Sequence, residues 1–202
     1  MSHKESLKQL LLQKSLFRGN FTLSSGKQSN YYLDCKLTTL DADGAALTAY
    51  TILELLEDRG ISADAVGGPE LGAVPIVAAV AAVSSIRANS EKKGKPLPSF
   101  LVRKEAKGHG RQRQIEGIEI GKVQRVAIVD EVCTTAGSVE IALAAVKREG
   151  LEITAVIILV DRQEGGHEKL RSEYGDRYIP IFTAEELLKA AGQAKVEPSR
   201  VA

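Results

Sequence analysis

The sequence predicts an α/β fold in which helices cover both faces of a parallel sheet. Short apolar runs alternate with amphipathic segments from Ala65 onward, the pattern of strands that alternate with helices. The runs Val126–Val129 and Val156–Val160 are apolar at every position, as in strands buried on both faces. The length of 202 residues fits roughly one domain, so we expect a single domain over residues 1–191.

The N-terminal part has a different pattern and should form a small separate layer. Ser2 can cap a helix over Lys4–Gln13, where leucines recur at helical spacing. Phe21–Leu23 and Tyr31–Leu33 are predicted strands of a hairpin on either side of a polar turn. A second helix is predicted from Gly44 to Arg59, with Gly60 as its C-terminal glycine.

The remaining elements alternate along the chain. The predicted strands are Ala65–Val66, Phe100–Val102, Arg125–Val129 and Thr154–Val160, and the predicted helices between and after them are Pro75–Ile86, Ser138–Glu149 and His167–Tyr174. Thr183 and Glu186 form a capping-box pattern that opens a last helix ending at Ala191. Asn89–Pro98 is expected to be a surface loop, and residues 192–202 a flexible tail.

Composition and charge exclude several classes of protein. Lys and Arg number 27 against 26 Asp and Glu, a balance that argues against a nucleic-acid binder. The longest apolar stretch, Leu71–Val83, contains a proline and is too short to predict a membrane span. No apolar leader follows Met1, so we expect a cytoplasmic protein. Cys35 and Cys133 suit neither a disulfide framework nor a metal site, and we expect Cys133 to be structural.

Ligands of such sheets bind beyond the carboxyl ends of the strands, so the loops that follow the predicted strands are informative. Four of these loops are polar or rich in glycine: 67–72, 103–117, 130–138 and 161–166. We therefore expect them to line one binding edge.

The third loop has the chemistry of a phosphate site beside a sugar site. Asp130 and Glu131 follow a buried strand, and small or hydroxyl residues then lead into a helix. Free N–H groups and the helix dipole favour an anion there, to which the candidate residues Thr134, Thr135, Ala136, Gly137 and Ser138 would bind. Two acids beside an anion indicate a hydroxyl-bearing sugar or a bridging Mg²⁺.

Other phosphate-binding motifs are missing from the sequence. Gly117–Val123 is one residue too short for a P-loop and lacks its hydroxyl, and no G-x-G-x-x-G occurs. Nucleotide hydrolysis and dinucleotide redox chemistry therefore lose their main support.

The run VDEVCTTAGS resembles the phosphoribosyl pyrophosphate (PRPP) signature of the type I phosphoribosyltransferases. The resemblance implies their Rossmann-like fold with a small N-terminal hood, here about residues 1–40. It also implies that the two acids contact the ribose hydroxyls while the loop holds the 5′-phosphate. Glu131 and Ala136 depart from the commoner Asp and Gly of that family.

The second loop concentrates positive charge. Residues 103–113 hold five of the 27 fixed cations and two glycines, as expected of a mobile lid over a polyanion. The stretch resembles the R-K-x-x-K-x-H-G lid of orotate phosphoribosyltransferases, although Gly108 replaces a commoner Asp. Residues 21–34, 67–75 and 161–166 resemble further segments of that family, with Gln28 in place of a frequent Lys.

The resemblance implies an enzyme that converts orotate and PRPP into orotidine 5′-monophosphate and pyrophosphate, in de novo pyrimidine biosynthesis. The implied residues toward pyrophosphate are Lys107, His109, Arg103 and Lys104, and those toward orotate are Arg162, Lys27 and Tyr31. Mg²⁺ would be held mainly by PRPP rather than by the protein, and the enzyme would be a homodimer with shared active sites that binds neither nucleic acid nor membrane.

Two alternatives stay open at this stage. The chain could transfer phosphoribose to another base, such as a purine, although the lid and residues 161–166 favour orotate. It could instead be a regulator that senses PRPP without catalysis, although it has no spare residues for a DNA-binding domain. His167 is interpreted only as the start of a helix, and His3 as part of a mobile terminus.

Overall fold

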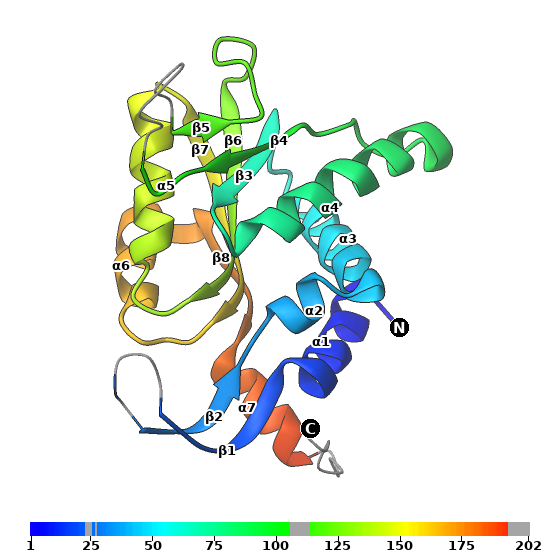
Figure 1. Ribbon diagram of the computed structural model, residues 1–202. Helices are drawn as coiled ribbons and strands as arrows, with labels where there is room; N and C mark the ends of the chain where they lie inside the picture. Colours follow the sequence, from blue (N-terminus) through cyan, green and yellow to red (C-terminus); the bar gives the residue numbers. More distant parts are fainter. Residues whose placement is uncertain (23–25, 27, 106–113, 194–202) are drawn as a thin grey trace.

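The computed structural model describes residues 1–22, 26, 28–105 and 114–193, and within them a central sheet has the strand order β5-β4-β3-β6-β7-β8 (Figure 1). All neighbouring strands are parallel except β5, which runs antiparallel to β4. The strands are β3 (Ala65–Pro69), β4 (Ser99–Val102), β5 (Ile115–Glu116), β6 (Arg125–Cys133), β7 (Glu152–Asp161) and β8 (Tyr178–Thr183). The predicted fold class is confirmed.

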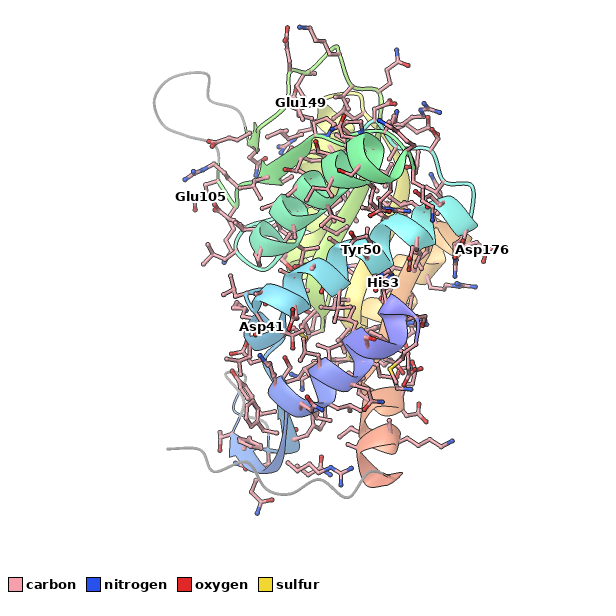
Figure 2. The ribbon with its side chains drawn as sticks, turned by 90° about the vertical axis from the view of Figure 1, so that its right-hand side faces the viewer. His3, Asp41, Tyr50, Glu105, Glu149 and Asp176 are labelled. Atoms are coloured by element: carbon pink, nitrogen blue, oxygen red, sulfur yellow. The ribbon has the colours of Figure 1, made fainter. Side chains whose placement is uncertain are left out.

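Successive strand residues pack against opposite layers, which explains the unbroken apolar runs. Ala127 and Val129 of β6 join a core cluster with the helices α1 (His3–Lys14), α3 (Ala42–Asp58) and α4 (Ala73–Ile86). Val126 and Ile128 join a second cluster with α5 (Gly137–Arg148) and α6 (Gly166–Tyr174). Figure 2 shows α1, α3 and α4 lying across the first face of the sheet.

Two strands, β5 and β8, were not predicted, and the other strands of the sheet were predicted too short, β3 by three residues and β6 by four. β8 contains Pro180, which an edge strand tolerates because one side of it carries no ladder hydrogen bonds. β6 continues four residues beyond Val129, because Asp130 and Cys133 still pair with Ile158 and Asp161 of β7. Asp130 and Glu131 therefore lie in the strand, not in the loop that the sequence predicted to start there.

The N-terminal hood has the predicted helix and a hairpin, whose strands begin earlier than the predicted Phe21–Leu23 and Tyr31–Leu33. Ser2 caps α1 by accepting a hydrogen bond from the Glu5 N–H, and β1 (Leu16–Thr22) pairs antiparallel with β2 (Gln28–Leu33). A short helix that was not predicted, α2 (Lys36–Thr39), connects the hairpin to α3. Residues 23–25 and 27 of the predicted turn lie outside the described residues.

The helix α4 continues into a π-helical turn, Arg87–Glu91, that occupies the start of the predicted 89–98 loop. Together they form a helix of 19 residues, which is long and apolar enough to cross a membrane. Length and composition are weak evidence by themselves, and this helix packs against α3, β3 and β4.

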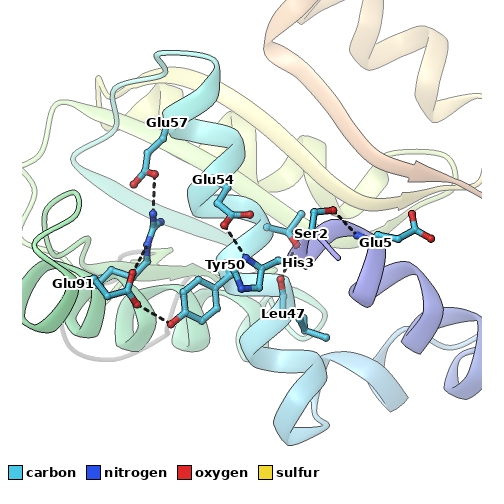
Figure 3. A network of polar contacts seen from close by, with 10 residues as sticks. Ser2, His3, Glu5, Leu47, Tyr50, Glu54, Glu57 and Glu91 are labelled. Atoms are coloured by element: carbon cyan, nitrogen blue, oxygen red, sulfur yellow. Dashed lines mark hydrogen bonds and ion pairs between the residues drawn. The ribbon is translucent and has the colours of Figure 1, made fainter.

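A polar network joins the π-turn to α3 and α1 (Figure 3). Arg87 donates to Glu57 over 2.8 Å, and the Tyr50 hydroxyl donates to Glu91 over 3.2 Å. His3 stacks on Tyr50 with ring centroids 4.5 Å apart, and its Nδ1 lies 2.7 Å from Glu54. The expectation that His3 belongs to a mobile terminus is therefore wrong.

The last helix, α7 (Ala184–Gln193), begins as predicted, with the Thr183 hydroxyl accepting from the Glu186 N–H over 3.1 Å. It ends two residues beyond the predicted boundary at Ala191, so Gly192 and Gln193 are helical. Residues 194–202 of the predicted tail lie outside the described part of the chain.

Candidate functional site

The loops that follow β3, β6 and β7 meet at one edge of the sheet. A Cβ added to Gly72 would lie 2.9 Å from Asp130 Oδ1, and one added to Gly166 would lie 2.6 Å from Cys133 Sγ. The Gly166 N–H donates to the Thr134 carbonyl over 2.9 Å, and only glycine fits at both close approaches. Three of the four predicted loops are thus packed together.

Asp130 lies buried at the base of this edge. Its Oδ1 accepts from the Glu131 N–H over 2.8 Å, and its Oδ2 accepts from the Ser138 hydroxyl over 3.0 Å. Burial outweighs these hydrogen bonds and raises the pKa of Asp130 to about 6, with the charge of Glu131 adding to the rise. The Ser138 hydroxyl, predicted to face an anion, is directed at Asp130 instead.

Glu131 is buried beside it and has only one of its two carboxylate oxygens paired. Oε1 accepts from the Lys36 ammonium group, whereas Oε2 is buried with no hydrogen-bond partner. A buried carboxylate oxygen without a donor carries a desolvation cost that a ligand hydroxyl group can remove. The edge therefore has a free acceptor where the sequence predicted a sugar.

Thr134, Thr135 and Ala136 form the turn between β6 and α5, and Gly137 and Ser138 begin the helix. The first N–H groups of an α-helix have no intrahelical partner, and the helix dipole makes this end positive. Ala136 has φ +69°, in the left-handed region that favours glycine. The departure of Ala136 from the family's commoner Gly therefore has a conformational cost.

Arg162 and Tyr31, predicted to bind the same substrate, contact each other. The Arg162 Cζ lies 5.2 Å from the centroid of the Tyr31 ring, a cation–π distance. One side of the guanidinium group pairs with Glu164 over 2.7 Å, while Nε is buried without a hydrogen-bond partner. The hood and the loop after β7 therefore meet at the contact between Tyr31 and the planar guanidinium group of Arg162.

Asp161 is a further residue of this edge, and sequence reasoning gave it no role. It is fully buried at the end of β7, where it accepts from the Gln163 N–H and the Tyr178 hydroxyl, each over 2.8 Å. His167 Nδ1 lies 2.6 Å from its Oδ2, so His167 does more than begin α6. These contacts fix the bend of the chain that precedes Arg162. The sequence does not reveal them, because Tyr178 lies on β8, which pairs with β7 only in the folded protein.

The basic loop is described only at its two ends. The Arg103 N–H donates to the Gln114 carbonyl over 3.0 Å, and the Lys104 N–H donates to Glu70 over 3.1 Å. Arg103 and Lys104 thus lie beside the loop after β3. Lys107, His109 and Lys27 lie outside the described residues.

The protein donors at this edge suit a metal that arrives with its ligand. Within the described ranges, no group of three or more His, Cys, Asp or Glu side chains could hold a metal ion. Asp130 and Glu131 provide two adjacent carboxylates, and Mg²⁺ is typically bound by one or two carboxylates together with substrate phosphates and water.

Comparisons with known proteins agree with the geometry. The family model for the phosphoribosyl transferase domain matches residues 41–183. An orotate phosphoribosyltransferase of Pyrococcus furiosus is 40% identical over 190 residues, which cover 94% of this chain and 97% of the relative. The orotate phosphoribosyltransferase of Mycobacterium tuberculosis, crystallised with Fe(III) dicitrate, superposes with a TM-score of 0.76 at 35% identity, covering 92% of this chain and 98% of the other. The same enzyme crystallised with PRPP gives a TM-score of 0.72 at 32% identity with the same coverage.

Proposed function

Because the chain belongs to the phosphoribosyltransferase family, we propose that it transfers the phosphoribosyl group of PRPP to orotate. The products are orotidine 5′-monophosphate and pyrophosphate, in a step of pyrimidine biosynthesis. The observation that carries the proposal is the pair of buried acids, Asp130 and Glu131, in the strand that the turn of residues 134–136 connects to the N-terminus of α5. The choice of orotate as the base rests on the relatives, which are orotate phosphoribosyltransferases.

The reaction needs positioning and charge stabilisation more than a protein nucleophile. Substitution at the anomeric carbon builds positive charge on the ribose and negative charge on the leaving pyrophosphate. Asp130 and Glu131 would bind the ribose hydroxyls, with the unpaired Glu131 oxygen as one acceptor. The 5′-phosphate would accept from N–H groups of residues 134–138, which the helix dipole favours.

The orotate carboxylate would bind to Arg162, because a planar guanidinium group matches a carboxylate with two parallel hydrogen bonds. Tyr31 would cover the pyrimidine from the hood, and Lys27 is a second candidate contact. Arg162 already forms an ion pair with Glu164, so the orotate carboxylate would either displace Glu164 or bind to the guanidinium group beside it.

The pyrophosphate group would be neutralised by Arg103, Lys104, Lys107 and His109. Bound Mg²⁺ would add charge neutralisation at the pyrophosphate oxygens, and PRPP rather than the protein would provide most of its ligands. Lys104 lies next to Glu70, which would orient this end of the loop toward the acids of β6.

A base panel tests the proposed function. Purified protein is incubated with PRPP and Mg²⁺ and with orotate, uracil, adenine or hypoxanthine, and pyrophosphate release is measured. Pyrophosphate release with orotate, and with none of the other bases, supports the proposal. Release with a purine establishes the alternative base, and PRPP binding without release for any base establishes the regulator.

We also propose a homodimer with shared active sites, as the family resemblance implies, and a cytoplasmic location stays a prediction from the sequence. Mixing Lys107→Ala protein with Arg162→Ala protein should give more activity than either variant has alone if the two residues serve one site from different subunits. A monomer in sedimentation, or no such gain in the mixture, would contradict the shared site.

A further inference from the structure

Lys36 contacts the ribose-side acids although no motif of the sequence includes it. Its ammonium group donates to Glu131 Oε1 across 95 positions of the chain. The Lys36 side chain is 47% exposed, whereas that of Glu131 is only 11% exposed, so a cation at the cleft surface reaches a carboxylate below it. Among the described ion pairs, this one joins the hood to the acids of β6.

The backbone of Lys36 is held firmly enough to aim this side chain. The preceding Cys35 is 1% exposed and packs in the main core cluster. The Asp34 carboxylate accepts from the Lys36 N–H over 3.1 Å, which fixes the start of α2. The side chain therefore leaves a rigid point of the hood and ends on Glu131.

The same short segment also carries Tyr31. Tyr31 contacts Arg162 on the base side of the edge, and Lys36, five residues later, contacts Glu131 on the ribose side. One stretch of chain, from β2 into α2, thus touches both parts of the proposed site.

Two adjacent buried acids place like charges side by side, and a nearby cation offsets their repulsion. Within the described part of the chain, the Asp130 carboxylate accepts hydrogen bonds from the Glu131 N–H and the Ser138 hydroxyl, neither of which is charged. We infer that Lys36 is a positioning residue, which holds Glu131 by Oε1 so that its unpaired Oε2 faces the ribose of the phosphoribosyl donor. The inference rests on the proposed function for the identity of that ligand.

Kinetics and binding of a variant pair test this role. Lys36→Met should raise the KM for PRPP and the Kd of PRPP in titration calorimetry roughly tenfold, as is typical when a residue that orients a binding group is lost. The KM for orotate should stay near the wild-type value. Lys36→Arg, which keeps the charge, should restore most of the PRPP affinity.

The matched control is Lys14→Met. Lys14 is also a hood lysine, 42% exposed, and pairs with Asp41 of the α3 cap rather than with the site acids. It should leave both KM values unchanged. Equal PRPP affinity of the two methionine variants, or an equal rise in both KM values for Lys36→Met, would overturn the inference.

The pH profile gives a readout that a merely structural role would not move. Among the described residues, the groups that act on Asp130 are Glu131 and Cys133 on its own strand, Ser138 of α5, and Cys35 and Lys36 of the hood. Of these, only Lys36 is a cation, so Lys36→Met should move the acid limb of kcat/KM for PRPP to higher pH. An unmoved limb would contradict the inference.

Two further arms keep the result interpretable. Thermal unfolding is measured first, and Lys36→Gln, a polar but uncharged side chain as long as methionine, replaces Lys36→Met if that variant does not fold. If wild-type protein binds PRPP but transfers it to no base, the proposed function fails while the calorimetric comparison still decides the role of Lys36.

Discussion

Asp64 and Asp130 lie at opposite ends of the same part of the sheet and differ in nearly every property. Asp64 precedes β3 and accepts from the Arg125 N–H over 3.0 Å and the Gln124 N–H over 3.3 Å. The side chains of Arg125 and Lys95 approach its other oxygen to 3.3 and 3.4 Å. These hydrogen bonds, the Arg125 N–H first, lower the pKa of Asp64 to about 2, whereas burial raises that of Asp130 to about 6.

The difference separates a carboxylate that holds the fold from a buried one whose few, uncharged donors leave it able to accept from a ligand as well. Asp64 has two N–H donors and two cationic side chains around its oxygens and ties the start of β6 to β3, whereas Asp130 accepts from one N–H group and one hydroxyl group. Asp130 and Glu131 are buried with fewer donors than they can accept, which costs stability and marks a functional edge. The amino edge of the sheet should therefore tolerate loss of charge without loss of activity, and the carboxyl edge should not.

The largest difference between the two edges is expected in kcat when a cation is removed from each. Lys107→Ala should lower kcat about 10²–10³-fold, because stabilising a developing charge is typically worth that much. Lys95→Ala, which removes a cation beside Asp64, should leave kcat unchanged. Steady-state kinetics with PRPP and orotate measure both, and similar kcat values for the two variants would break the comparison.

A second pair compares two arginines. Arg162→Ala should raise the KM for orotate about 10–100-fold, since losing a charge-assisted hydrogen bond in a site costs about 1.5–3 kcal/mol. The KM for PRPP should change little. Arg125→Ala, at the amino edge, should lower the melting temperature and leave both KM values in place. A rise in both KM values for Arg162→Ala would remove its assignment to the base.

The two carboxylates should give stability profiles of opposite slope. The pKa of Asp130 is higher in the folded than in the unfolded state, so its contribution is full below about pH 4 and is lost as the pH rises to about 6, a change of about 3 kcal/mol at most. The pKa of Asp64 is lower when folded, so its contribution is present above about pH 4 and is lost toward pH 2; partial exposure reduces it to about 1 kcal/mol.

Denaturant unfolding across this pH range measures both profiles. Asp130→Asn should remove the loss of stability that accompanies a rise from pH 4 to 6. Asp64→Asn should remove part of the loss of stability that accompanies a fall below pH 4. If Asp130→Asn left the stability profile between pH 4 and 6 unchanged, that would contradict the rise in the pKa of Asp130 that we attribute to its burial.

The smallest effect concerns the turn before α5. Ala136→Gly should stabilise the protein by about 0.5–1 kcal/mol, because glycine relieves the left-handed conformation at φ +69°. Ala144→Gly, at an exposed position inside α5, should destabilise it by about 1 kcal/mol. Chemical denaturation of both variants gives the signs, and the same sign for both would contradict the strain at Ala136.

The apolar alternation predicted the sheet because burial on both faces leaves a local signal. Val126–Val129 and Val156–Val160 are apolar at every position for that reason. β8 was missed because Pro180 is allowed only by its place at the sheet edge, a property of the tertiary fold. The end of β6 was misplaced because acids in a strand look like a loop until the pairing with β7 is known.

The site divides in the same way. Asp130, Glu131 and residues 134–138 are contiguous, so a motif could indicate them. Lys36 and Asp161 were missed because their partners, Glu131 and Tyr178, are remote in sequence or lie on an unpredicted strand. Arg162 and Tyr31 were each predicted to bind orotate, but their contact with each other could not be predicted because they lie far apart in the sequence.

The most direct test of the difference between the two edges is calorimetric titration of PRPP, with Mg²⁺, into wild-type, Asp130→Asn and Asp64→Asn proteins. We expect Asp130→Asn to bind PRPP at least about tenfold more weakly, the effect of about 1.4 kcal/mol, and to bind orotate as the wild type does. Asp64→Asn should bind PRPP with wild-type affinity although it is less stable. Undiminished PRPP affinity in Asp130→Asn, or an equal loss in Asp64→Asn, would contradict the assignment of the carboxyl edge as the phosphoribosyl site.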